Sequence, residues 1–233
     1  MSNFTEKQKE LDPEFTGFFD SFAFAEVPES SGIDERTRYV AILASLLGCQ
    51  GVNEFKAILP LALNSLSPVE VKEILYQSTA YLGIGRVYPF FDAANEIMEK
   101  ESIELPLPSQ STTNPENRLE KGIGVQVDLF GDQMADFWKA SDINRFLATN
   151  CFGDYYTRNG LDYKNRELIT FCFLASLGGC ELQLLAHSQA NFMQGNDKEF
   201  LIEIVYQLVP YIGYPRSLNA ISIVNKAAEE FEK

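Results

Sequence analysis

The 233-residue sequence predicts an all-α fold built from two tandem helical-bundle repeats. Three observations carry this prediction. Apolar runs long enough for helices follow residues that commonly cap helix starts, sustained alternation of apolar and polar residues is missing, and one helical pattern occurs twice. An internal duplication accounts for the last observation.

The repeat is visible in two pairs of segments. Residues 44–49 read ASLLGC, and residues 175–180, 131 positions later, read ASLGGC. Further along, YQSTAYLGIGR at 76–86 is matched 130 positions later by YQLVPYIGYPR at 206–216. Because the spacing changes by a single residue, the two copies align through one short loop difference.

The first copy is predicted to contain four helices. The apolar run at 38–48 indicates a buried helix, and a second helix follows a glycine break. Ser67 as N-cap with Pro68 behind it marks the start of a third helix, which ends near Gly83. Residues 89–100 form the fourth helix.

The second copy is predicted to repeat this order. A glycine-containing helical segment at 122–131 leads into it, and the apolar run at 167–178 is its buried helix. A second helix again follows a glycine break. Asp197 takes the capping position of Ser67, the third helix ends near Gly213, and residues 217–233 close the unit.

The stretch between the copies, residues 101–118, is rich in Pro, Ser and Thr and has no helical periodicity, so it is a linker. We therefore predict a first, degenerate repeat at residues 1–105, a linker at 106–118 and a second repeat at 119–233, which carries the candidate site.

The charge balance limits the partners. There are 19 Lys and Arg against 33 Asp and Glu, a formal net charge of −14, which disfavours nucleic acid and anionic membranes. No signal peptide and no apolar run of membrane-spanning length are visible, so a cytoplasmic location is expected. The cysteines are far apart without a CxxC, as expected of reduced thiols: Cys49, Cys151, Cys172 and Cys180.

The single histidine of the chain lies in GGCELQLLAHSQANF, residues 178–192. Cys180, Gln183 and His187 are spaced i, i+3 and i+7, which predicts one helix face for all three. A lone histidine on an apolar helix is also typical of a packed core residue, so both interpretations stay open. One histidine and scattered cysteines give no metal-binding spacing, and no cofactor is predicted.

Two longer stretches resemble a known family. EKGIGVQVDLFGDQMADF at 120–137, followed by FGDYYTRNGLDYKNRELITFCFLASLGGCELQLLAHSQANFMQG at 152–195, is similar to the carboxymuconolactone decarboxylase family, which includes the alkylhydroperoxidase D-like proteins. The FGDYYTRNGLD turn, the RELI helix start and the AH pair occur in order. The resemblance implies a helical fold that forms a homo-oligomer, a trimer of two-repeat chains or a dimer, and a small-molecule substrate.

The resemblance leaves two chemistries open. In the hydroperoxidase branch a CxxC precedes the histidine by four residues; here Cys180 holds the first cysteine position, but Gln183 holds the second. A peroxiredoxin-like activity through Cys180 is the alternative. The decarboxylase branch has the histidine without the CxxC, which implies cofactor-free decarboxylation of a small lactone or related carbonyl compound with His187 as proton donor. A non-catalytic oligomeric ligand-binding protein is the third hypothesis.

Other residues are assigned supporting roles. Glu181 or Glu167 is expected to pair with His187, and Gln183 to orient the imidazole or hold a substrate oxygen. Leu185 stands where the decarboxylases carry an arginine, so an anionic substrate would meet another arginine: Arg158, Arg166 or Arg216. Substrate-binding candidates in the same pocket, for which packing is the competing interpretation, are Tyr206 and Tyr211.

In the first copy Lys56 stands where His187 stands in the second. This lysine either supplies a cation to a shared site or belongs to a copy that serves as a structural partner.

Overall fold

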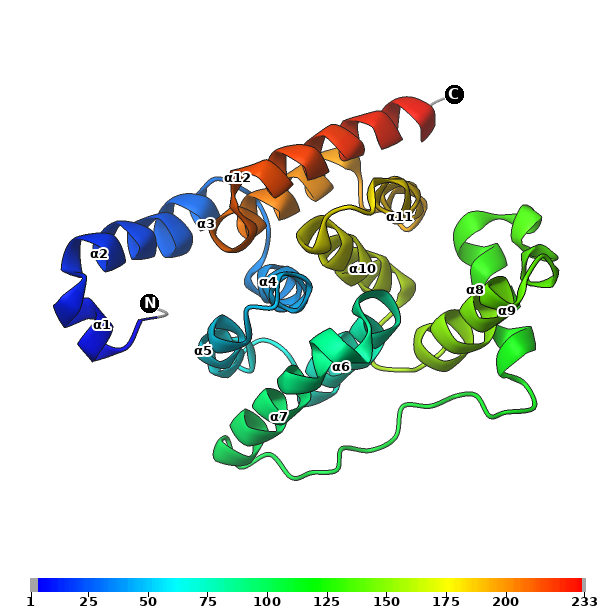
Figure 1. The fold of residues 1–233 in the computed structure, drawn as a ribbon, viewed down its shortest axis with the longest axis horizontal. Coiled ribbons are helices and arrows are strands. Elements are labelled where there is room, and N and C mark those ends of the chain that lie inside the picture. The colour runs from blue at the N-terminus through cyan, green and yellow to red at the C-terminus, as the bar shows by residue number, and fades with distance from the viewer. Residues whose placement is uncertain (1–3, 232–233) are drawn as a thin grey trace.

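The computed structural model describes residues 4–231, and all regular structure in this range is helical (Figure 1). This confirms the all-α prediction. Residues 232–233, the expected end of the last helix, lie outside the described range, as do residues 1–3.

The chain begins with an N-terminal arm that the sequence did not reveal. It consists of α1 (Glu6–Leu11), α2 (Pro13–Ser21), the π-helical turn η1 (Phe22–Glu26) and α3 (Val27–Glu29). Figure 1 shows α1 and α2 at one end of the molecule, beyond α4 and α5.

The first repeat has the expected helix order. Its helices are α4 (Glu35–Cys49), α5 (Val52–Ala62), α6 (Pro68–Leu82) and α7 (Ile84–Lys100). Ser67 caps α6 as predicted: its hydroxyl accepts the backbone N–H of Glu70, while the Glu70 side chain accepts the backbone N–H of Ser67. The expected linker is free of helix up to Asn117, and its last residue, Arg118, begins α8 (Figure 1).

The second half has more elements than the sequence indicated. They are α8 (Arg118–Phe130), the 3-10 turns η2 (Asp132–Met134) and η3 (Phe137–Lys139), α9 (Asp142–Phe146), the π-helical η4 (Leu147–Tyr156), α10 (Tyr163–Leu177), α11 (Glu181–Met193) and α12 (Lys198–Phe231). The last of these is broken at Gly213, whose φ of 75° and ψ of 166° are not helical. Asp197 caps α12, accepting the backbone N–H of Phe200.

Two details correct the sequence-based boundaries. The buried helix α10 starts before Glu167, because the Asp162 side chain accepts the backbone N–H of Asn165 and caps it there. The segment at 152–162 is a turn only in its second half, since η4 continues to Tyr156.

The centre of the molecule is the crossing of α4 and α10. Ser176 donates its hydroxyl hydrogen to the Ser45 hydroxyl oxygen across 2.9 Å, and both side chains are buried. A Cβ on Gly48 would lie 2.7 Å from the Cβ of Ser176, so only glycine permits this approach. The largest apolar core draws residues from both repeats.

Several of these features recur at the spacing of the repeat. Ser45 and Ser176 are 131 positions apart. Gly83, at the end of α6, has a φ of 77° and a ψ of 146°, close to the values at Gly213. These matches agree with a duplication, which stays an inference from the sequence, as do the repeat boundaries.

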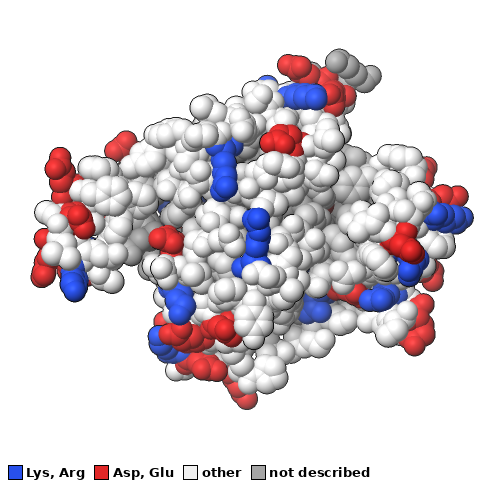
Figure 2. All heavy atoms as spheres, viewed as in Figure 1, with Lys and Arg blue, Asp and Glu red and all other residues white. Residues whose placement is uncertain are grey.

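Charges are unevenly spread over the face shown in Figure 2. Acidic side chains gather along the periphery, including the N-terminal arm and the end of α12, while the middle of the face is mostly uncharged apart from a few basic side chains. Within residues 4–231, no helix combines the length and apolar character needed to cross a membrane.

Candidate active site

The centre of the candidate site is a buried pair formed by His187 on α11 and Glu167 on α10. His187 Nδ1 lies 2.7 Å from Glu167 Oε2, and the Glu167 side chain is fully buried. Asn191, one turn after His187, donates from Nδ2 to the backbone oxygens of both residues. The prediction named two possible carboxylate partners for His187, and the structure brings Glu167 to it.

A chain of hydroxyl groups supports the carboxylate. Tyr156 donates its hydroxyl hydrogen to Glu167 Oε1 across 2.8 Å, so its oxygen accepts from its other neighbours. These neighbours are the Thr170 hydroxyl at 2.8 Å and the Tyr81 hydroxyl at 2.9 Å. Gln77 in turn donates from Nε2 to Thr170. Every hydrogen in this chain therefore points toward Glu167.

The pKa values of the neighbouring groups keep them protonated. Burial, followed by the negative charge of Glu167, raises the pKa of Tyr156 well above its ordinary value. Burial likewise raises the pKa of Tyr81, with Cys151 and Glu167 adding to it, and raises the pKa of Cys151 to about 12. These groups remain neutral hydrogen-bond donors across the physiological pH range.

Aromatic rings hold the imidazole. The rings of Tyr81 and Phe130 each pack against His187 edge to face, with centroid separations of 5.5 Å. Phe130 comes from α8 and packs on Phe152 of η4. The ring of His187 is therefore fixed by contacts from α6 and α8 as well as by Glu167.

The second ring nitrogen of His187 is available for chemistry. Nε2 forms no hydrogen bond within residues 4–231, and it is not among the fully enclosed polar atoms. The side chain as a whole is 10% exposed. A buried Nδ1 side and an accessible Nε2 are the geometry of a general acid or base whose tautomer is set by a carboxylate.

Arg166 and Arg158 form ion pairs with Glu73 and not with the carboxylate beside His187. Both contact the buried Glu73 of α6, Arg158 through Nε at 2.9 Å and Arg166 at 3.0 Å. Arg166 also donates to Gln77 Oε1 across 2.8 Å. Two of the three arginines considered as partners of an anionic substrate therefore pair with Glu73 and not with a group at His187.

Cys180 lies in a different environment from His187. It precedes the first residue of α11, its thiol donates to the Leu174 carbonyl oxygen, and it lines a small cavity of about 50 Å³ with Glu181 and Arg216. Burial and then the Glu181 carboxylate raise the pKa of this thiol, so the start of α11 does not activate it. No group of three or more His, Cys, Asp or Glu side chains in residues 4–231 is placed to hold a metal ion.

Gln183 is exposed on α11, whereas His187 is buried. The two side chains were expected on one helix face, but the structure places one in solvent and the other in the interior. Tyr206 is also exposed.

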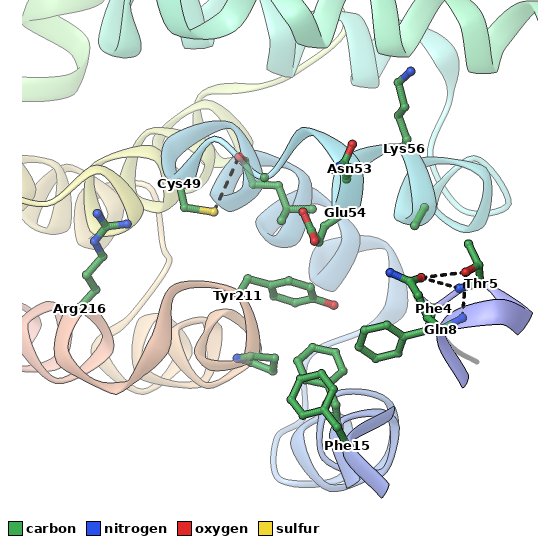
Figure 3. A pocket seen from close by; sticks show the side chains of 15 residues that line it. Phe4, Thr5, Gln8, Phe15, Cys49, Asn53, Glu54, Lys56, Tyr211 and Arg216 are labelled. Atoms are coloured by element: carbon green, nitrogen blue, oxygen red, sulfur yellow. Dashed lines mark hydrogen bonds between the residues drawn. The ribbon is translucent and has the colours of Figure 1, made fainter. Parts of the chain in front are cut away.

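The remaining predicted residues line a large cavity of about 990 Å³ between the N-terminal arm, the α4–α5 region and α12 (Figure 3). Arg216 lies at one end of it, Tyr211 in the middle, and Gln8 at the far end. Lys56 lines the same cavity, and its amine pairs with Glu96 at 2.7 Å. Lys56, Tyr211 and Arg216 are thus brought together, but away from the residues that contact His187.

Sequence reasoning missed the residues that complete the site. Tyr156 lies within the FGDYYTRNGLD segment, so the family resemblance was an available signal. Tyr81 is the residue of segment 76–86 that aligns with Tyr211, and its place beside His187 follows from the packing of α6 against α10. Thr170 and Phe130 gave no signal of their own.

Comparisons with known proteins relate the second half of the chain to one family. Residues 141–226 match the sequence model of the carboxymuconolactone decarboxylase family. A 4-carboxymuconolactone decarboxylase of Acinetobacter baylyi (strain ATCC 33305 / BD413 / ADP1) is 27% identical over 125 residues, which is 50% of this chain and 91% of that protein. In its second half, the chain is therefore similar to the carboxymuconolactone decarboxylase family.

Proposed function

We propose that the chain is a decarboxylase-like enzyme that acts on a small lactone or related carbonyl compound by acid–base chemistry at His187. The observation that carries the proposal is the buried Glu167–His187 pair with its accessible Nε2. The similarity to a protein named 4-carboxymuconolactone decarboxylase supports the reaction class.

The proposed reaction assigns one proton transfer to His187. When the bond between the substrate carbon and its carboxylate breaks, CO₂ leaves and the electron pair passes into the adjoining carbonyl system. Protonated His187 then donates the Nε2 proton to the resulting enolate, and the neutral ring regains a proton from solvent. Glu167 accepts the Nδ1–H and compensates the positive charge of the imidazolium, while Tyr156 holds the carboxylate in place.

The test is CO₂ release from a panel of carboxylated lactones and keto acids by the wild type and three variants. His187→Gln should lower kcat about 10²- to 10⁴-fold, because it removes the proton donor. Glu167→Gln should also lower kcat strongly, because an amide cannot compensate the imidazolium charge. Cys180→Ser is the matched control and should retain activity.

Activity that survives in His187→Gln but is lost in Cys180→Ser would overturn the proposal in favour of thiol chemistry. Circular dichroism of each variant separates loss of catalysis from loss of fold.

A second candidate is a non-catalytic small-ligand-binding protein, and the 990 Å³ cavity lined by Tyr211 and Arg216 favours it. Saturable binding of a panel compound without turnover, unchanged in His187→Gln, would support this candidate over the enzyme.

A further inference from the structure

Lys72 of α6 is a buried cation without a counter-ion. The residue is 7% exposed, and its amine donates to the side-chain oxygen of Asn95. Within residues 4–231 it forms no ion pair, and burial lowers its pKa. Buried ammonium groups are normally paired with a negative charge, so this position lacks one.

The neighbouring ion pairs add to the excess of positive charge. Glu73 is the carboxylate for both Arg158 and Arg166, and it is almost fully buried. Two guanidinium groups therefore share one negative charge. Lys72, which directly precedes Glu73 in the chain, adds a third cation to this region, in a protein whose overall formal charge is −14.

These residues line a cavity of about 250 Å³. Val69, Lys72, Glu73 and Tyr76 lie on one face of α6 and form one wall, and the linker residues 107–110 form another. Arg158 completes the lining, and Glu73 is the one carboxylate in it.

The guanidinium group of Arg158 has donors without an acceptor in the described chain. Its Nε contacts both oxygens of Glu73, and its guanidinium carbon lies 5.0 Å from the centre of the Tyr76 ring. Its two terminal nitrogens form no hydrogen bond in the described part of the chain, and they are not among the fully enclosed polar atoms. A guanidinium held at Nε and open at its other nitrogens is suited to carboxylate or phosphate oxygens.

We propose that this cavity binds a small oxyanion, carboxylate or phosphate, between Lys72 and the terminal nitrogens of Arg158. The exposed hydroxyl of Ser109 on the linker wall offers a further donor. The site is distinct from His187, and the proposal does not depend on the decarboxylase function.

The test is isothermal titration calorimetry of the full chain with inorganic phosphate, acetate and succinate, at constant ionic strength. Saturable binding of at least one anion is expected. Lys72→Met should weaken it about ten-fold or more, because one charged donor is lost. The same variant should melt at a higher temperature than the anion-free wild type, because it removes an uncompensated buried charge. Lys56→Met, which removes a surface-paired lysine at the other cavity, is the matched control and should bind like the wild type.

A second variant keeps the proposal testable if Lys72→Met does not fold. Ser109→Glu introduces a carboxylate on the cavity wall, so it should abolish anion binding while raising the melting temperature. The proposal is wrong if no anion gives saturable heat with the wild type, or if both variants bind as tightly as the wild type. Binding of phosphate alone or of carboxylates alone would identify which oxyanion the site takes.

Discussion

At the scale of single residues, His187 differs from a packed core histidine because only one of its two ring nitrogens has a hydrogen-bond partner in the protein. Nδ1 is fixed by a carboxylate that itself receives a hydroxyl hydrogen, while Nε2 has no protein partner in the described chain. The other expected partner, Glu181, is six positions away on the same helix. At about 100° per residue, this separation turns it well away from His187.

Cys180 gives a prediction at this scale. A raised pKa means that the thiolate forms only at a pH above that of an ordinary cysteine, so at pH 7.4 the side chain is a thiol. Peptide mass spectrometry after hydrogen peroxide treatment should therefore show Cys180 unmodified. The same protein unfolded in urea is the control, in which the residue should be oxidised. Sulfenic acid or a disulfide at Cys180 in the folded protein would revive the peroxidase alternative.

At the scale of helices, the sequence was informative where capping residues and apolar runs coincide. The starts of α6 and α12 were predicted because Ser67 and Asp197 cap them by a local mechanism. The arm helices and η4 were missed. A π-helix departs from the 3.6-residue period on which such predictions depend, and α1 buries none of its residues.

Contacts between distant parts of the chain were also beyond prediction at the candidate site. Glu167 was predicted from the family resemblance, as an acidic residue at the start of the helix before His187, whereas Tyr81 reaches the ring from α6, 106 positions earlier in the chain. Only the packing of α6 on α10 creates that contact, and packing between distant helices leaves no local sequence pattern.

The α6 cap gives a prediction at this scale. Burial alone would raise the pKa of Glu70, but hydrogen bonds from Ser67 and the charge of Arg36 outweigh it, and the net shift is downward. A lowered pKa stabilises the fold above the unfolded-state value, and this contribution is lost as the pH falls through the folded-state value. Ser67→Ala should lower the free energy of unfolding by about 1 kcal/mol at pH 7.

The difference between Ser67→Ala and the wild type should shrink between pH 7 and an acid pH below the lowered pKa of Glu70, because Glu70 is then protonated in both. Urea unfolding of both proteins at pH 7 and at the acid pH measures this difference in the free energy of unfolding. Ser21→Ala, at an exposed position, is the control. An equal loss of stability at both pH values would show that the Glu70 charge plays no part.

At the scale of the whole molecule, the first half of the chain contributes to the candidate site of the second. Tyr81 and Gln77 of α6 belong to the hydrogen-bond chain that ends at Glu167. The mirrored contribution is Tyr211 of α12, which enters the cavity that contains Lys56. Each half therefore contributes a tyrosine to the surroundings of the other half: Tyr81 to the candidate site, and Tyr211 to the cavity that Lys56 lines.

Surface residues at matching positions give the last prediction. Just after the Gly83 and Gly213 breaks, four large apolar side chains are exposed: Ile84 (54%), Tyr88 (63%), Tyr214 (64%) and Leu218 (64%). Each pair is spaced i, i+4 and so lies on one helix face, and the second pair follows the first by 130 positions. Exposed apolar patches of this kind are typical of interfaces.

We expect these two faces to join copies of the chain into the homo-oligomer, a trimer or a dimer, that the family resemblance implies. Light scattering after size-exclusion chromatography should give a multiple of 26.2 kDa for the wild type. Tyr88→Glu combined with Leu218→Glu should lower the mass toward that of one chain, because charge at both faces opposes burial. Leu11→Glu, which charges an exposed residue of α1, should leave the mass unchanged. A wild-type mass of 26.2 kDa would mean that the two faces do not join copies of the chain, and an altered mass in Leu11→Glu alone would place the interface on the N-terminal arm instead.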